Sequence, residues 1–203
     1  MNIGKLVESV TYDKWCWVDC MKLGPRGADF ADVNGSSAGQ CSLRPDEGLD
    51  AVSVLAPGML TSRLSQVFSP LIDMLVEQLG YQGGRSLMGA PYDWRLAPRR
   101  LEERDAFFTK LKADIERAVQ LNRRPAIIIA HSMGNLVVQY FVAWLEATQP
   151  RTWRAWIDRH LWCYVGLGAP LLGAVGALKP TLTGETFGLS ISEAQVSGWG
   201  VYT

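Results

Sequence analysis

The residues best suited to covalent chemistry surround Ser132. An apolar, β-branched run of strand length at 125–130 leads into the serine, with small residues two positions before it and two after it, Ala130 and Gly134. This is the pattern of a nucleophile elbow, a sharp turn that holds a serine in a strained backbone conformation and needs small neighbours. Apolar residues recur at helical spacing over 135–148. The sequence therefore predicts a serine nucleophile between a buried strand and a helix.

An activated serine also needs an oxyanion hole and a base. In the elbow architecture one N–H donor belongs to the residue after the serine, Met133, and the other to the loop after an earlier strand, where Met59 stands. The only histidine after Ser132 is His160, and it precedes the next predicted strand. That position is too early for the usual Ser, acid, His order, so we interpret His160 as a helix-end or interface residue rather than the base. We expect His131 to point away from the serine's face.

Two other polar groups could be taken for catalytic residues. Asp93 and Arg95 are two positions apart and offer Ser132 neither nucleophile nor base. We interpret them as a structural ion pair or loop anchor. The Glu and Arg residues that begin the segment 101–121 are interpreted as a solvated helix face.

The order of predicted elements indicates a parallel α/β sheet. Strands are predicted at 51–57, 87–94, 125–130 and 162–170, and helices at 69–79, 101–121 and 135–148. Ser69 is the predicted N-cap of the first of these helices, Pro70 its first residue, and Gly80 its end. Right-handed crossovers place the carboxyl ends of the strands at one edge, where Met59, Ser132 and Gly168 are expected.

Composition restricts the class of protein. With 203 residues and 48% apolar content, the chain predicts one domain with a substantial core. Twenty basic residues balance twenty acidic ones, which gives no case for a nucleic-acid partner. No apolar run reaches the ~20 residues of a membrane span, and acidic and basic residues interrupt the first 14 positions where a signal peptide would lie. We expect a cytosolic chain or one whose natural amino terminus is missing.

Cysteines and tryptophans leave alternatives open. The four cysteines lack metal-ligand spacing with a histidine, so neither metal nor cofactor is predicted. A bridge between Cys20 and Cys41 could staple a polar loop in an oxidising lumen, although the sequence does not fix the pairing. Three of the eight tryptophans lie near His160. They either pack in the core or form an amphipathic surface that meets lipid.

Several motifs in order resemble the lecithin:cholesterol acyltransferase family, over about residues 15–195. They are Ala-Pro-Tyr-Asp-Trp-Arg at 90–95, Ala-His-Ser-Met-Gly at 130–134 and Gly-Ala-Pro at 168–170. The phospholipid:sterol acyltransferase branch is resembled most, through Arg-Pro-Asp-Glu-Gly-Leu at 44–49, Leu-Glu-Glu-Arg-Asp at 101–105, Val-Gly-Leu-Gly-Ala-Pro-Leu-Leu-Gly at 165–173 and Thr-Phe-Gly-Leu at 186–189. The phospholipid:diacylglycerol acyltransferases are also similar.

The resemblance implies an α/β-hydrolase fold and a phospholipid acyl donor. A fatty acyl group would pass to the nucleophile Ser132, with Met133 and Met59 as backbone oxyanion donors, and then to a sterol or another lipid alcohol at a membrane surface. The alternatives are transfer to diacylglycerol, hydrolysis as a phospholipase A, and a non-catalytic lipid-binding remnant. We expect the endoplasmic reticulum or another endomembrane, lumenal side preferred, with the cytosol kept as an alternative.

The resemblance also implies what this chain lacks. The acidic and His members of the triad lie well downstream in that family, so residues 1–203 are expected to form one partial α/β-hydrolase domain, the amino-terminal part of the sheet. Segments at about 24–50 and 180–203 resemble lid regions over a lipid site. We expect these 203 residues to be inactive alone.

Overall fold

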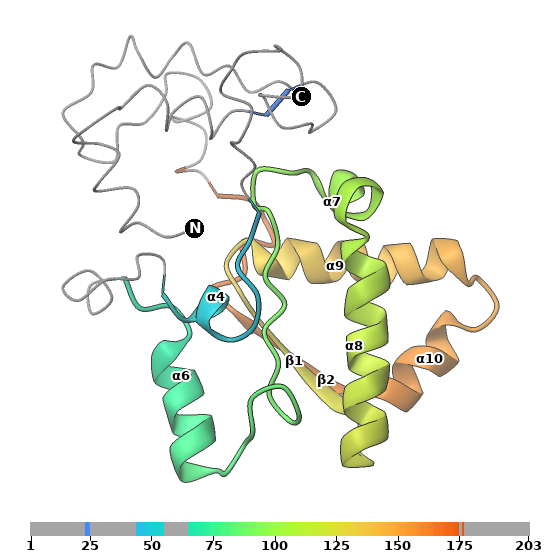
Figure 1. Cartoon of the computed structure of the whole chain (residues 1–203). Helices are drawn as coiled ribbons and strands as arrows, with labels where there is room; N and C mark the ends of the chain where they lie inside the picture. Colours follow the sequence, from blue (N-terminus) through green and yellow to red (C-terminus); the bar gives the residue numbers. More distant parts are fainter. Residues whose placement is uncertain (1–22, 25–43, 55–64, 175, 177–203) are drawn as a thin grey trace, which may run out of the picture.

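The computed structural model describes residues 23–24, 44–54, 65–174 and 176. Within them, a two-stranded parallel sheet joins β1 (Ala126–His131) to β2 (Leu161–Leu167). The register is irregular between Ala126 and Ile127 and regular from there to the pair His131 and Leu167. In Figure 1 the two strands run between α6 on one side and α8 and α10 on the other.

The helices around this sheet are short to medium in length. They are α4 (Asp50–Ser53), α6 (Ser69–Asp73) continued by the π-helix η2 (Met74–Gln78), α7 (Pro98–Asp105), α8 (Phe107–Asn122), α9 (Gly134–Thr148) and α10 (Trp153–His160). The crossover from β1 to β2 thus consists of α9 and α10, as a parallel pair of strands requires.

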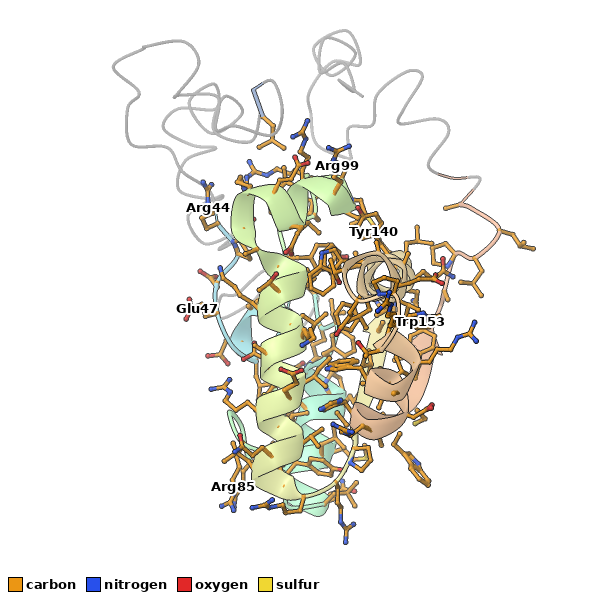
Figure 2. All side chains as sticks on the ribbon, turned by 90° about the vertical axis from the view of Figure 1, so that its right-hand side faces the viewer. Arg44, Glu47, Arg85, Arg99, Tyr140 and Trp153 are labelled. Carbon is orange, nitrogen blue, oxygen red and sulfur yellow. The ribbon has the colours of Figure 1, made fainter. Side chains whose placement is uncertain are left out.

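The described core lies where α8, α9 and α10 meet. Phe108 and Phe141 are fully buried, with stacked rings 6.2 Å apart, and Trp156 meets Phe141 edge-on at 5.9 Å. Tyr140 and Trp153 pack against this cluster from α9 and α10 (Figure 2). Aromatic packing of this kind adds about 0.5–1.5 kcal/mol per pair beyond area burial. The core therefore holds the crossover helices firmly beside β1.

The centre of the chain folds as the sequence predicts. Strand β1, helix α9 and strand β2 match the predictions at 125–130, 135–148 and 162–170 to within a few residues. The β-branched run and the helical apolar spacing on either side of the turn are both strong local signals. The helix predicted at 69–79 is also present, as α6 and η2.

The amino-terminal end of α6 differs from the prediction. Phe68 occupies the N-cap position and Ser69 is the first helical residue, with a buried hydroxyl that lacks a hydrogen-bond partner among the described residues. Pro70 lies in the first turn, and Gly80, at φ 70°, follows the end of η2. Pro and Gly thus punctuate the helix as expected, while the Ser69 cap is wrong by one position.

The strand predictions at 51–57 and 87–94 are wrong for the residues that the structure describes. Asp50–Ser53 form α4, where Ser53 Oγ donates to Leu49 O at 2.7 Å, and Val54 makes only an isolated bridge. Residues 88–93 form no strand, because Pro91 lacks an N–H and the chain passes tightly over Gly48. A Cβ placed on Gly89 would lie 2.3 Å from Gly48 O. The described sheet therefore has two strands instead of four.

The long helix predicted at 101–121 is two helices. Ala106 takes a left-handed conformation, φ 51°, and separates α7 from α8. Glu102 then reaches forward, and its Oε2 accepts the backbone N–H groups of Phe108 at 2.8 Å and Thr109 at 3.1 Å. This carboxylate caps the start of α8, where the helix dipole favours negative charge. Glu102 is therefore a capping group, and its assignment to a solvated face is wrong.

Several predicted features lie outside the described residues. They are most of the lid-like segment 24–50, Met59, Cys20 and Cys41, and the segment 180–203. Each stays a prediction.

Candidate active site

Ser132 lies at the turn from β1 into α9, and its backbone is strained as the elbow pattern predicts. Its φ is 51°, one of three positive values at non-glycine positions in the described part of the chain. A non-glycine residue in this region costs on the order of 1 kcal/mol or more and persists only where the surroundings impose it. A Cβ added at Gly134 would lie 3.8 Å from Ala130 Cβ. The turn therefore accepts the methyl group of Ala130, and a methyl group at Gly134 would make only an ordinary van der Waals contact with it.

The end of β2 holds the backbone of this turn. Ser132 N donates to Leu167 O at 2.9 Å, which extends the parallel ladder by one residue beyond β1. Asn135 Nδ2 donates to Ser132 O at 2.8 Å and to Leu167 O at 3.2 Å. Tyr164 Oη donates in turn to Asn135 Oδ1. The strained serine is thus bonded to the neighbouring strand directly and through one amide side chain.

Sequence reasoning missed Asn135. Its side chain is fully buried although it opens an otherwise apolar helix. A buried amide must be hydrogen-bonded to avoid a desolvation cost. One feature of the sequence could have indicated a buried, hydrogen-bonded Asn135. It is an amide side chain three positions after the nucleophile, in the first turn of a helix whose next residues are apolar.

Met133 is positioned as an oxyanion donor would be. It is the exposed N-cap residue of α9, and in the described part of the chain its N–H makes no hydrogen bond. A free N–H at a helix N-terminus, next to the nucleophile, suits the negative charge of a tetrahedral intermediate. Its proposed partner Met59 lies outside the described residues.

Neither histidine is hydrogen-bonded to Ser132. The Ser132 hydroxyl makes no hydrogen bond to any residue that the structure describes, and the His131 ring meets Phe68 edge-on at 6.2 Å. His160 ends α10, where its Nδ1 lies 2.8 Å from Trp156 O and its ring stacks on Trp156. Because Leu161 pairs with Ala126, His160 lies at the opposite end of the strands, roughly 20 Å from the turn. The helix-end interpretation of His160 is confirmed.

Asp93 and Arg95 form the ion pair that the sequence predicts. Arg95 Nε donates to Asp93 Oδ1 at 2.8 Å, and the backbone N–H of Arg95 reaches the same oxygen at 3.2 Å. Arg104 on α7 adds a bond of 2.7 Å to Asp93 Oδ2. Burial opposes ionisation of Asp93, but the hydrogen bonds from Arg95 and Arg104 and the charge of Arg95 outweigh it and lower the pKa of Asp93.

The charges of α7 divide between two environments. Glu103 pairs with Arg99 and Arg100 on the exposed side, as predicted for a solvated face. Arg104 instead points to Asp93 and Asp105. Its hydrogen bond to Asp105 makes the largest contribution to raising the pKa of Arg104, and the bond to Asp93 adds to it, although partial burial acts in the opposite direction. Helix α7 is therefore anchored through Arg104 to the loop at 88–97.

Other kinds of site are not found in the described residues. They contain no group of three or more His, Cys, Asp or Glu side chains placed to hold a metal ion. None of their helices combines the length and apolar character needed to cross a membrane.

The described geometry defines a class: a parallel α/β protein with a serine on a strained strand-to-helix turn, bonded to the next strand and followed by a free backbone N–H. A profile of the lecithin:cholesterol acyltransferase family matches residues 3–200. The chain belongs to this family, as its motifs indicate.

Relatives of this chain are acyltransferases by name. It is 44% identical over 194 residues to phospholipid–sterol O-acyltransferase of Arabidopsis thaliana, covering 95% of this chain and 29% of the relative. It is 31% identical to phospholipid:diacylglycerol acyltransferase of Saccharomyces cerevisiae, covering 89% and 25%, and 31% identical to human lysosomal phospholipase A and acyltransferase, covering 84% and 38%. The chain thus spans well under half the length of these relatives.

Proposed function

We propose that this chain is part of a serine-dependent phospholipid:sterol O-acyltransferase with an α/β-hydrolase fold. The observation that carries the proposal is Ser132 at φ 51° between β1 and α9, beside the Met133 N–H, which makes no hydrogen bond to the described residues. The sequence likeness to the Arabidopsis phospholipid–sterol O-acyltransferase supports the choice of donor and acceptor.

The proposed reaction has two transfers. Ser132 Oγ attacks the ester carbonyl of a phospholipid, its proton passes to a base outside the described residues, and the lysophospholipid leaves as the carbonyl re-forms. A sterol hydroxyl then attacks the acyl-enzyme, gives its proton to the base, and releases Ser132 with its proton restored. The N–H groups of Met133 and Met59 stabilise the oxyanion in both steps.

Exposed apolar side chains near the turn support a lipid substrate. Met133 and Leu136 are exposed on the first turn of α9, and Leu171 and Leu172 follow β2 at the same edge of the sheet. Apolar groups gathered on one side of a reactive serine would favour an acyl chain at a membrane surface. The proposed lid segments, about 24–50 and 180–203, would close over this side.

An oxidising compartment is proposed from the cysteines. A Cys20–Cys41 bridge would staple the first lid segment and place the protein in the lumen of the endoplasmic reticulum or another endomembrane. Non-reducing peptide mapping of protein from its native source should recover the bridged peptide. Two free thiols would favour the cytosol instead.

Product analysis tests the acceptor. The protein expressed from its complete gene is given vesicles of phospholipid with a labelled acyl chain, together with sterol and diacylglycerol. We expect labelled steryl ester, lost in Ser132→Ala. Label found in triacylglycerol would move the assignment to the diacylglycerol acyltransferases, and label found as free fatty acid would move it to the phospholipases.

A second candidate is a non-catalytic lipid-binding chain. The observation that favours it is that neither histidine of the 203 residues bonds to Ser132. Loss of the base from a serine triad lowers the rate by about 10⁶-fold. The 203-residue chain should therefore resist a fluorophosphonate probe, which needs an activated serine. Labelling of that chain, abolished by Ser132→Ala, would show that a base is present and contradict this candidate.

A further inference from the structure

The strain at Ser132 needs an identifiable restraint, because a positive φ at serine relaxes unless neighbouring contacts oppose it. Of the hydrogen bonds to the Ser132 backbone, the turn itself contributes one backbone bond, the 3.1 Å contact from Asn135 N to Ser132 O. The remaining bonds come from the end of β2 or from the Asn135 side chain. The restraint on Ser132 is therefore mainly tertiary. It consists of the direct bond to Leu167 and of the hydrogen bonds made by the Asn135 amide.

The Asn135 amide joins both sides of the turn. Its Nδ2 donates to Ser132 O and to Leu167 O, so one group fixes the serine carbonyl relative to the strand that also accepts the serine N–H. The Oδ1 atom accepts the Tyr164 hydroxyl, which fixes the orientation of the amide. All three hydrogen bonds of this fully buried amide thus join it either to the serine turn or to β2.

The neighbouring residue on β2 leaves room for this arrangement. A Cβ placed on Gly166 would lie 2.9 Å from both Asn135 Oδ1 and the Tyr164 hydroxyl oxygen, closer than real Cβ atoms approach. Strand β2 therefore supplies an acceptor at Leu167, a donor at Tyr164 and a gap at Gly166. These three features lie within four consecutive residues of the strand and serve a single amide.

We propose that Asn135 and Tyr164 are positioning residues that hold Ser132 Oγ and the Met133 N–H in their reactive arrangement. This inference rests on the proposed function, in which Ser132 is the nucleophile. Asn135 acts through the backbone and does not need to touch the substrate. Its loss lowers the rate of acylation and leaves the affinity for phospholipid unchanged, since a displacement of about 1 Å at a reacting atom costs about 100-fold in rate.

The test measures fluorophosphonate labelling and steady-state kinetics in the protein expressed from its complete gene. Asn135→Leu removes the amide at similar volume and should lower the labelling rate constant and kcat by about 100-fold, with KM for phospholipid vesicles unchanged. Tyr164→Phe removes only the hydroxyl and should lower them by about tenfold. Because the two residues act as a unit, the double variant should be no slower than Asn135→Leu alone.

Asn122→Leu is the matched control. Asn122 also donates two side-chain hydrogen bonds to backbone carbonyls, those of Arg85 and Ala118, each at 2.8 Å, and it ends α8 away from the turn. The Asn122→Leu variant should lower the thermal midpoint without changing the labelling rate of the folded protein.

Asn135→Ser, which keeps one hydrogen-bond donor, should recover part of the labelling rate that Asn135→Leu loses.

Two results separate the failure of this inference from the failure of the proposed function. If Ser132→Ala is labelled as strongly as the unsubstituted protein, the nucleophile is wrong and the inference falls with it. If Ser132→Ala abolishes labelling while Asn135→Leu and Tyr164→Phe keep the normal rate constant, only the positioning role is overturned. A loss of rate that merely follows the loss of folded protein, as measured by circular dichroism, would overturn it as well.

Discussion

At Asp93, a buried carboxylate is stabilised by two arginines from different elements. Arg95 lies in the same loop, whereas Arg104 lies on α7. The ion pair of Asp93 with Arg104 therefore ties that loop to the helix. Buried charges are tolerated where partners and hydrogen bonds replace the lost hydration. Removing the carboxylate would leave two guanidinium groups facing each other in a partly buried position. Asp93 is therefore expected to matter for stability rather than for the chemistry at Ser132.

Asp93→Asn should lower the free energy of unfolding by about 3 kcal/mol, because one partner of a buried pair is lost. The pH dependence follows from the lowered pKa of Asp93. The folded protein holds the ionised form, so this contribution is complete above the ordinary value of 3.8 and is lost as pH falls through the lower pKa of the folded state. Urea titrations at several pH values below 5 would measure it.

Asp114→Asn is the control for this prediction. Asp114 pairs with Arg117 on an exposed face of α8, at 2.8 Å. Exposed pairs contribute about 0–1 kcal/mol, so this variant should change stability little at any pH. Equal losses from Asp93→Asn and Asp114→Asn would contradict a special role for Asp93.

At the scale of elements, the break between α7 and α8 shows what local sequence leaves undetermined. Between Leu101 and Leu121 the apolar positions Phe108, Leu111, Ile115 and Ala118 recur at helical spacing, and alanine, the residue at 106, has the highest helix propensity. The break at Ala106 depends on Glu102 capping α8 and on Arg104 bonding to Asp93, contacts that a residue-by-residue pattern does not contain. Tertiary contacts here override helix propensity.

Ala106→Gly should raise the free energy of unfolding by about 0.5–1 kcal/mol, because glycine adopts φ 51° without the Cβ penalty. Ala113→Gly makes the same chemical change at an exposed position inside α8, where glycine costs about 1 kcal/mol. The two variants should thus shift the thermal midpoint in opposite directions, as measured by circular dichroism. A fall with Ala106→Gly would mean that α7 and α8 join in solution.

The turn itself was the most predictable part of the chain. The strand, the serine, its small neighbours and the following helix are all contiguous, so the sequence predicts them together. The ion pair of Asp93 and Arg95 was predictable for the same reason. The supporting hydrogen bond joins Asn135 to Tyr164, which lies 29 residues further along the chain. The strands expected at 51–57 and 87–94 likewise depended on pairing between distant segments. Pairing over such distances leaves no short-range signal.

At the scale of the whole molecule, β2 is the most exposed part of the described sheet. It pairs with β1 on one side, and no second partner strand is present among the described residues. Trp162 is 74% exposed, and Tyr164, Val165 and Leu167 are also exposed. An apolar strand with an unpaired edge is a template for association with another chain.

The 203-residue chain produced alone should therefore self-associate at micromolar concentrations. Trp162→Lys should reduce the associated fraction seen in sedimentation velocity, because a charged residue on an edge strand blocks pairing. Trp94→Lys is the control, since Trp94 is 57% exposed but lies outside the sheet. A monomeric unsubstituted chain, or an equal effect of both substitutions, would contradict the prediction.

The bonds between the serine turn and β2 also determine when the nucleophile can form. Asn135, in the first turn of α9, and its acceptor Leu167 are 32 residues apart, and the rest of α9 and all of α10 lie between them. During synthesis, Ser132 leaves the ribosome well before the strand that holds it. Until the crossover helices have packed and β2 has joined β1, Ser132 lacks its bond to Leu167, and its turn is not held in the strained geometry. Pairing of the two strands is therefore the folding step that completes the geometry of the proposed nucleophile.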